Sequence, residues 1–181
     1  MAAASAALPD AIVTYASTAN DPSQGSPYTF SSQGIGTAAD NRTVAVGVVA
    51  HADGSGVITG VTVGGVTATK IVEDHSGELG SEEGAIWTAP LAAGTTADIV
   101  VTISGTPHRC NIGVWALYGV GDSDVQVTDN ALPLSQSITI SDGGVAVALS
   151  FNNQAGGNVS SWGSDFTERY DTFIEPNSAA S

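Results

Sequence analysis

The stretch Thr43-Val44-Ala45-Val46-Gly47-Val48-Val49-Ala50-His51-Ala52 decides the fold class of this chain. Apart from Thr43, Gly47 and His51, every residue in it is valine or alanine. The run is far shorter than the ~20 residues that a membrane-spanning helix needs, and it is rich in valine, which favours strands. It therefore predicts a β-strand that is buried on both faces.

Short runs of the same kind recur on both sides of this stretch, separated by turns that contain glycine. Gly64-Gly65 lies between two such runs, which is typical of a two-residue hairpin. Apolar residues do not recur at helical spacing, and the gaps are too short for the crossover helices that parallel strands require. We expect strands at residues 11–16, 28–32, 43–52, 61–63, 66–73, 85–89, 97–104, 110–118, 125–128, 137–140, 145–151 and 166–170.

These runs predict an all-β chain that folds as a single antiparallel β-sandwich, because short strands with frequent turn signals are typical of that architecture. The strand order is not visible in the sequence, so a jelly-roll and an immunoglobulin-like topology both stay open. Residues 1–26 hold few large apolar side chains, most of their apolar residues being alanine, and include Asp21-Pro22-Ser23-Gln24-Gly25-Ser26. We therefore expect an extended N-terminal arm at residues 1–26 and a β-sandwich domain at residues 27–181.

Positive charge is scarce in this chain. One lysine, Lys70, and three arginines stand against 18 acidic residues, which gives a formal net charge of −14. A nucleic-acid-binding protein needs a basic surface for phosphates, and an anionic membrane surface also attracts basic residues. We therefore expect no nucleic-acid partner and no membrane partner. Because β-proteins commonly protect exposed edge strands with lysine, the edges here must be covered by the fold itself or by neighbours in an assembly.

Few residues suggest a metal or redox site. Cys110 is the single cysteine, so it forms no disulfide within the chain, and its apolar surroundings predict an inert core thiol. The three histidines, His51, His75 and His108, are not at metal-binding spacing and are expected in turns or at the surface. Residues 73–83 contain five carboxylates, which could hold calcium, but their spacing does not match a calcium loop. We favour a solvated, flexible loop there and predict no metal, no cofactor and no catalytic residue.

Motifs for catalysis are also missing from the sequence. There is no G-x-S-x-G elbow, no phosphate-binding loop of the Walker type and no dinucleotide-binding glycine pattern. We therefore predict that the chain is not an enzyme. Trp162, Phe166 and Tyr170 lie close together in the sequence and could stack on sugars. We favour a structural interpretation in which these aromatic side chains close one end of the sandwich.

Several stretches, taken in order, resemble a known group of proteins. They are Tyr28-Thr29-Phe30-Ser31, residues 34–46, Val61-Thr62-Val63-Gly64-Gly65-Val66-Thr67-Ala68-Thr69, Ala85-Ile86-Trp87, residues 94–102 and Arg109-Cys110-Asn111-Ile112-Gly113-Val114-Trp115-Ala116-Leu117. Together they resemble β-sandwich structural proteins of tailed bacteriophages and prophages, over about residues 28–120. The resemblance implies a virion component, and the group supplies no catalytic residues to transfer.

The resemblance gives the functional expectation. We expect a non-enzymatic phage structural protein located in the virion, most simply a capsid decoration (cement) protein that stabilises the head by bridging neighbouring capsid subunits. Its partners would be the major capsid protein or other virion proteins and further copies of itself, with a trimer as one arrangement. Few long charged side chains mean that little side-chain entropy is lost at such contacts. The alternatives are a tail or baseplate component and a carbohydrate-binding module for host recognition.

Overall fold

The computed structural model describes residues 10–53, 56–76, 82–121, 139–140 and 142–151. These residues form nine strands and no helix, so they contain no helix of the kind that could cross a membrane. The strands are β1 (Ile12–Asp21), β2 (Tyr28–Gly34), β3 (Arg42–Asp53), β4 (Ile58–Val63), β5 (Val66–Thr67), β6 (Thr69–Ser76), β7 (Glu82–Pro90), β8 (Thr96–Ile103) and β9 (Thr106–Tyr118).

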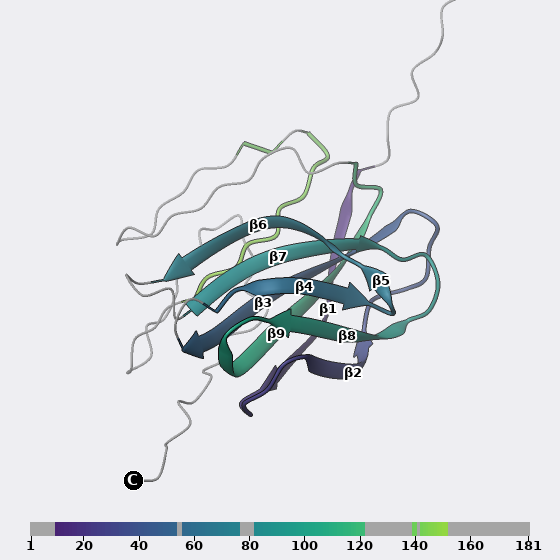
Figure 1. Ribbon diagram of the computed structural model, residues 1–181. Helices are drawn as coiled ribbons and strands as arrows, with labels where there is room; N and C mark the ends of the chain where they lie inside the picture. The colour runs from purple at the N-terminus through teal and green to yellow at the C-terminus, as the bar shows by residue number, and fades with distance from the viewer. Residues whose placement is uncertain (1–9, 54–55, 77–81, 122–138, 141, 152–181) are drawn as a thin grey trace, which may run out of the picture.

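The strands pair into two antiparallel sheets, which confirms the predicted β-sandwich (Figure 1). The five-stranded sheet has the order β1-β9-β3-β7-β6, and the four-stranded sheet has the order β2-β8-β4-β5. The first strand thus pairs with the last, β2 with β8, and β3 with β7, as in a long hairpin rolled on itself. This nested pairing is the jelly-roll arrangement, with β6 added at one edge. An immunoglobulin-like order is ruled out because its first two strands share a sheet, whereas β1 and β2 lie in different sheets.

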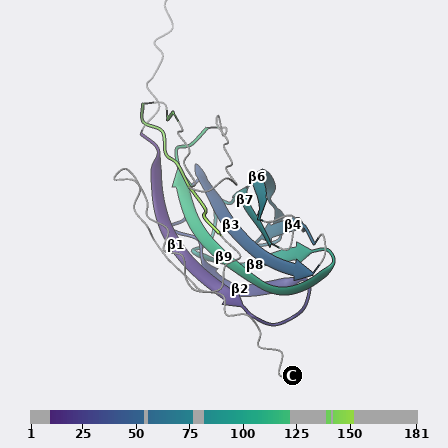
Figure 2. The ribbon, with the colours of Figure 1, turned by 90° about the vertical axis from the view of Figure 1, so that its left-hand side faces the viewer.

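The core lies between the two sheets. Figure 2 shows β1, β9 and β3 side by side as one curved layer. Val44, Val46 and Val48 of β3 alternate toward the other sheet, and Ile99 and Val101 of β8 face them; all five are completely buried. Residues 43–52 therefore belong to a central strand, β3, with β9 on one side and β7 on the other.

The predicted hairpin at Gly64-Gly65 is confirmed as the β4–β5 turn. Both glycines have positive φ, 57° and 81° respectively, as the turn that matches the right-handed twist of paired strands requires. The turn fixes the register of Val63 opposite Val66.

Arg42 holds two loops at one end of the sandwich. It is 2% exposed, and its Nε donates a hydrogen bond to the Leu91 carbonyl at 2.7 Å. Nη1 donates to the carbonyls of Gly36 (3.0 Å) and Gly94 (2.9 Å), and Nη2 donates to that of Ala93 (2.7 Å). The guanidinium therefore joins the loop after β2 to the loop after β7.

Residues 12–21 correct the prediction of an extended N-terminal arm. They form β1, which pairs with β9 along its length from Ile12 opposite Tyr118 to Asp21 opposite Cys110. The predicted strand at residues 11–16 is confirmed and extends to Asp21, so this part of the chain belongs to the sandwich. An edge strand needs few large apolar side chains, which is why the sequence also resembles an arm here. Residues 1–9 lie outside the described part of the chain.

Residues 145–151 also differ from the prediction, because the structure assigns them no strand. They pack by their side chains on the outer face of the five-stranded sheet, where Val145 and Val147 contact the cluster around Trp115. The Phe151 ring lies directly against Gly84 of β7. Apolar alternation therefore reflects packing on a sheet face here rather than membership of a sheet. The predicted strands at 125–128 and 166–170, and the first half of 137–140, lie outside the described residues.

Candidate functional site

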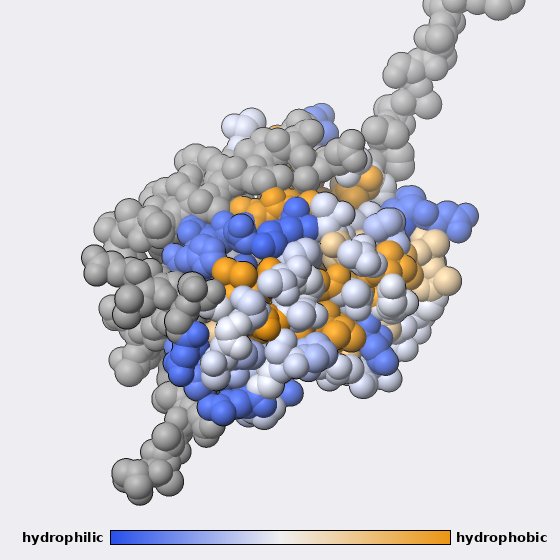
Figure 3. All heavy atoms as spheres, in the orientation of Figure 1, coloured by the Kyte–Doolittle hydropathy of each residue, from blue (hydrophilic) through white to orange (hydrophobic). Residues whose placement is uncertain are grey.

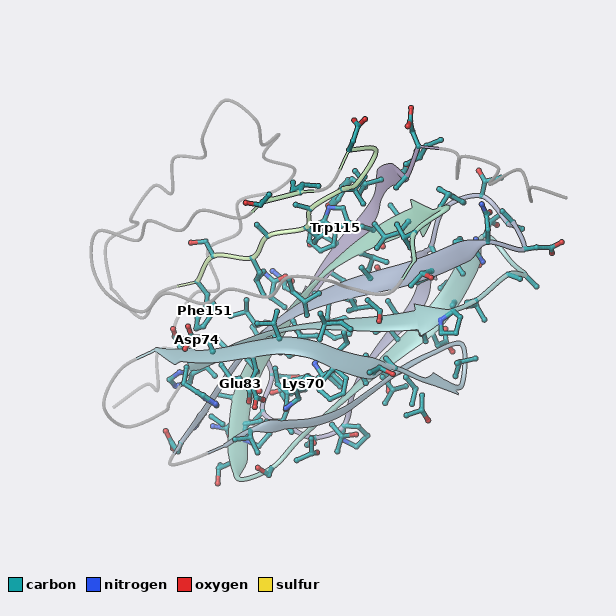
Figure 4. The ribbon with its side chains drawn as sticks, turned by 90° about the horizontal axis from the view of Figure 1, so that it is seen from above. Lys70, Asp74, Glu83, Trp115 and Phe151 are labelled. Atoms are coloured by element: carbon teal, nitrogen blue, oxygen red, sulfur yellow. The ribbon has the colours of Figure 1, made fainter. Side chains whose placement is uncertain are left out.

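Two polar clusters lie on opposite faces of the five-stranded sheet, at the end where β7 begins. Glu82 and Glu83 are consecutive residues of β7, so strand alternation places their side chains on opposite faces. Both are buried, at 5% and 1% exposure. Figure 4 shows this separation: Lys70 and Glu83 lie on one face of the sheet, and Asp74 and Phe151 lie on the other.

Glu83 belongs to the inner cluster, between the two sheets. Its Oε2 accepts a hydrogen bond from the backbone N–H of Ile58 in β4. Its Oε1 is buried and has no hydrogen-bond partner among the described residues; the Lys70 ammonium lies 3.9 Å away. Burial raises the pKa of Glu83 above its ordinary value, although the Ile58 hydrogen bond and the Lys70 charge oppose this.

β6 brings two further metal-binding side chains to Glu83. His75 is directly opposite Glu83 in the β6–β7 register, and Glu73 lies two residues before His75, on the same face. One ligand atom from each of Glu73, His75 and Glu83 lies within 4.8 Å of the other two. One imidazole nitrogen and two carboxylates form a donor set that suits a divalent transition metal.

Lys70 is the cation of this inner cluster. Its Nζ donates a hydrogen bond to Glu73, which lowers the pKa of that carboxyl. The same ammonium lies over the Trp87 ring, 5.1 Å from the ring centroid, in a cation–π contact. The indole Nε1–H of Trp87 is buried without a hydrogen-bond partner among the described residues.

The outer cluster is centred on Glu82. Arg109 Nη2 donates a hydrogen bond to Glu82 Oε1 at 3.4 Å, and His51 Nδ1 lies 3.6 Å from the same oxygen. Register explains the contact, because His51 of β3 lies opposite both Glu82 and Arg109. Burial lowers the pKa of His51 below its ordinary 6.5, and the nearby Arg109 and His108 act in the same direction. His51 is therefore neutral at physiological pH.

His108 extends this outer cluster toward solvent. Its Nε2 lies 2.8 Å from Asp53 Oδ2, and its Nδ1 lies 2.8 Å from the side-chain amide of Gln24. The His108 and His51 rings are 5.5 Å apart between centroids. A break in the β3–β9 register between His51 and Ala52 adds one residue to β9, which is how a β-bulge re-aims side chains.

The structure therefore corrects the predicted flexible loop at residues 73–83. Glu73, Asp74 and His75 belong to β6, while Glu82 and Glu83 belong to β7. Residues 77–81 lie outside the described part of the chain. Glu73 and His75 are two residues apart, as on one face of a strand, and the acidic pair Glu82-Glu83 follows later in the chain. This pattern was the signal in the sequence for a hairpin with polar side chains on its inner face.

The remaining candidates have three different outcomes. Cys110 is completely buried, as predicted, and burial raises the pKa of its thiol. The expectation that the histidines lie in turns or at the surface is wrong: His51, His75 and His108 lie in β3, β6 and β9 and are half-buried, and His51 and His108 converge although the sequence separates them. The aromatic group of Trp162, Phe166 and Tyr170 lies outside the described residues.

Comparison with known proteins adds no identity. The chain matches no protein-family model and no curated protein. The β-sandwich therefore rests on the structure itself, and any function must be argued from its surfaces and clusters.

Proposed function

We propose that the chain is a non-enzymatic structural protein of a phage particle, which decorates the capsid and bridges neighbouring capsid subunits. The observation that carries the proposal is the outer face of the four-stranded sheet. That sheet presents short hydroxyl side chains and almost no charge, a composition suited to contact with another protein surface.

One row of side chains crosses the whole sheet. Thr29 of β2 lies opposite Val100 of β8, Val100 lies opposite Thr62 of β4, and Thr62 lies opposite Thr67 of β5. Thr29 and Thr67 are exposed, while the two central residues are half-buried. In the four strands of this sheet, Asp98 is the only charged residue. Threonine loses little conformational freedom on contact, so such a face docks at low entropic cost.

The distribution of charge supports the same proposal. Arg42 donates hydrogen bonds to backbone carbonyls, and Arg109 donates one to Glu82. Lys70 donates a hydrogen bond to Glu73. The described cations are thus all paired within the chain, so these residues form no basic patch. In Figure 3 white and orange residues dominate the middle of the visible face, and blue ones gather toward its margins.

Among the described strands β1 pairs with β9 alone, and its other edge supports an assembly rather than an isolated protein. Ile12 and Val13 are 58% and 39% exposed, which makes them the large exposed hydrophobic residues of that edge. The strand has ten residues and contains neither lysine nor proline, the usual protections of an exposed edge. A neighbouring chain that pairs with or covers β1 would remove this liability.

The proposal is tested with particles of the phage or prophage that carries this chain. Heads that lack the protein are mixed with purified protein and sedimented, and their bursting temperature is measured. We expect binding in fixed stoichiometry and a higher bursting temperature. Thr62→Lys places a charge in the middle of the row of side chains that crosses the four-stranded sheet. It should weaken binding to the heads at least about tenfold, because an unpaired charge at a contact must be desolvated. Thr69→Lys adds the same charge to the other sheet and should bind normally.

Three results would overturn the proposal. They are failure to bind heads, attachment to tails instead, and binding to host glycans with no affinity for particles. The second result would indicate a tail or baseplate component, and the third a carbohydrate-binding module.

A further inference from the structure

We propose that Glu73, His75 and Glu83 form a binding site for a divalent transition metal of the Zn²⁺ class, and that Lys70 competes with the metal for this site. The inference is independent of the proposed role in a phage particle. It rests on the geometry of the β6–β7 hairpin and on one buried carboxylate oxygen.

The paired strands β6 and β7 supply the three ligands. His75 and Glu83 form a directly opposed cross-strand pair, and Glu73 follows at the same-face position of the edge strand. Their ligand atoms lie within 4.8 Å of one another. Zn²⁺ binds nitrogen and carboxylate oxygen at about 2.0–2.2 Å, so the ligand atoms need to close by about an ångström. Glu73, whose side chain is 44% exposed, has the freedom to make that movement.

The buried oxygen of Glu83 is the second, independent observation. Glu83 is 1% exposed, and its Oε1 has no hydrogen-bond partner among the described residues; the one cation near it, the Lys70 ammonium, is 3.9 Å away. A buried carboxylate oxygen without a partner is costly unless a cation neutralises it. The other oxygen is already fixed by the Ile58 N–H, so Oε1 is the atom available to a metal.

The ligand types select the class of metal. Calcium takes six to eight oxygen ligands, and Mg²⁺ strongly prefers oxygen and retained water. A site with one imidazole and two carboxylates instead suits Zn²⁺ or a neighbouring transition ion, with a fourth position left for water. The bound ion would link the edge strand β6 to β7, and through Glu83 to β4.

Lys70 fills the same electrostatic role when metal is absent. Its ammonium bonds to Glu73 and lies 3.9 Å from Glu83 Oε1, so it sits between two of the proposed ligands. Its side chain is 30% exposed and can swing toward solvent when a divalent ion arrives. Replacing Lys70 by methionine removes this competitor while keeping an apolar stem over Trp87.

The experiment is a titration of the full chain with Zn²⁺, Mn²⁺ and Ca²⁺ in separate arms, followed by calorimetry and by melting temperature. We expect one Zn²⁺ per chain and a raised melting temperature. His75→Gln and Glu83→Gln should each weaken Zn²⁺ binding at least about 100-fold, because even partners outside the first coordination sphere are worth 10–100-fold. Lys70→Met should strengthen binding about tenfold or more.

Matched controls separate this site from unspecific binding. Asp74→Asn alters a carboxylate on the same strand but on the opposite face (Figure 4), so it should leave Zn²⁺ affinity unchanged. A His51→Gln, His108→Gln double variant removes the other histidine pair and should behave like the parent. If Glu83→Gln does not fold, His75→Gln and Glu73→Gln on the edge strand decide the question.

Four results would overturn the inference. These are no Zn²⁺ binding by the parent, undiminished binding by His75→Gln, binding of Ca²⁺ in preference to Zn²⁺, and an affinity that Lys70→Met leaves unchanged or lowers.

Discussion

Replacing Arg42 by methionine tests the internal use of positive charge most directly. The guanidinium makes four hydrogen bonds of 2.7–3.0 Å to the carbonyls of Leu91, Gly36, Gly94 and Ala93. A hydrogen bond to a charged group contributes about 1.5–3 kcal/mol, but carbonyls near the surface regain water when the arginine is lost. We therefore expect Arg42→Met to lower the free energy of unfolding by roughly 3–5 kcal/mol. For a chain of this size that corresponds to a fall in melting temperature of roughly 6–20 °C.

Urea unfolding followed by tryptophan fluorescence measures this change. The midpoint should fall while the dependence on denaturant stays constant, because the core exposed on unfolding is the same. Arg42→Lys serves as a graded control: one ammonium concentrates its donors on a single atom and cannot reproduce four hydrogen bonds that spread over three guanidinium nitrogens, so about half of the loss is expected. A value for Arg42→Met within about 1 kcal/mol of the parent would refute the conclusion that this side chain holds the two loops together.

Two further predictions concern the outer face of the five-stranded sheet. A Cβ at Gly84 would lie 2.1 Å from the Phe151 ring, so Gly84→Ala should destabilise the parent by about 1–3 kcal/mol. In a Phe151→Ala background the same change should be nearly neutral. An equal loss of stability in both backgrounds would show that the ring does not lie against Gly84. The second prediction concerns pH. The pKa of His51 is lower in the folded state than its ordinary value of 6.5. Near pH 6.5 the imidazole is therefore protonated in the unfolded chain but stays neutral in the folded chain. The free energy of unfolding thus falls as the pH drops through that value. His51→Gln removes this component, so the parent's stability relative to the variant should decline from pH 7.5 to pH 5.5 in urea melts at each pH. A difference that is constant or grows toward acid would contradict the pKa direction.

The central strands could be predicted from the sequence because their signal is local. The stretch at residues 43–52 is apolar on both faces, and β3 is indeed flanked by two strands and covered on its inner face by the other sheet. The hairpin at Gly64-Gly65 was also predictable. Its two-residue turn needs positive φ at both positions, and glycine adopts positive φ readily. The choice between jelly-roll and immunoglobulin-like topology was not, because the β1–β9 and β2–β8 pairings join residues far apart in the chain.

The polar clusters were missed for a different reason. Glutamate has low strand propensity, so Glu82 and Glu83 were assigned to a loop. In the structure each is held by a partner that the sequence does not place beside it: Glu83 by the Ile58 N–H and Glu82 by Arg109. Tertiary hydrogen bonds outweigh local propensity at these two positions, and the sequence alone could not supply those partners.

The location of the cations explains how so acidic a chain could still associate with copies of itself. Surfaces of like charge repel one another, and a net charge of −14 makes that repulsion substantial unless contacts avoid the carboxylates. The four-stranded sheet meets this condition, because Asp98 is its only charge. Arg42, Arg109 and Lys70 belong to strands of the other sheet and are each paired within the chain, so they supply no salt bridges to a contact through this face. Association through this sheet would therefore depend on shape and on short uncharged side chains, and added salt should strengthen it by screening the repulsion between acidic copies, whereas a contact built on ion pairs would weaken as salt is added.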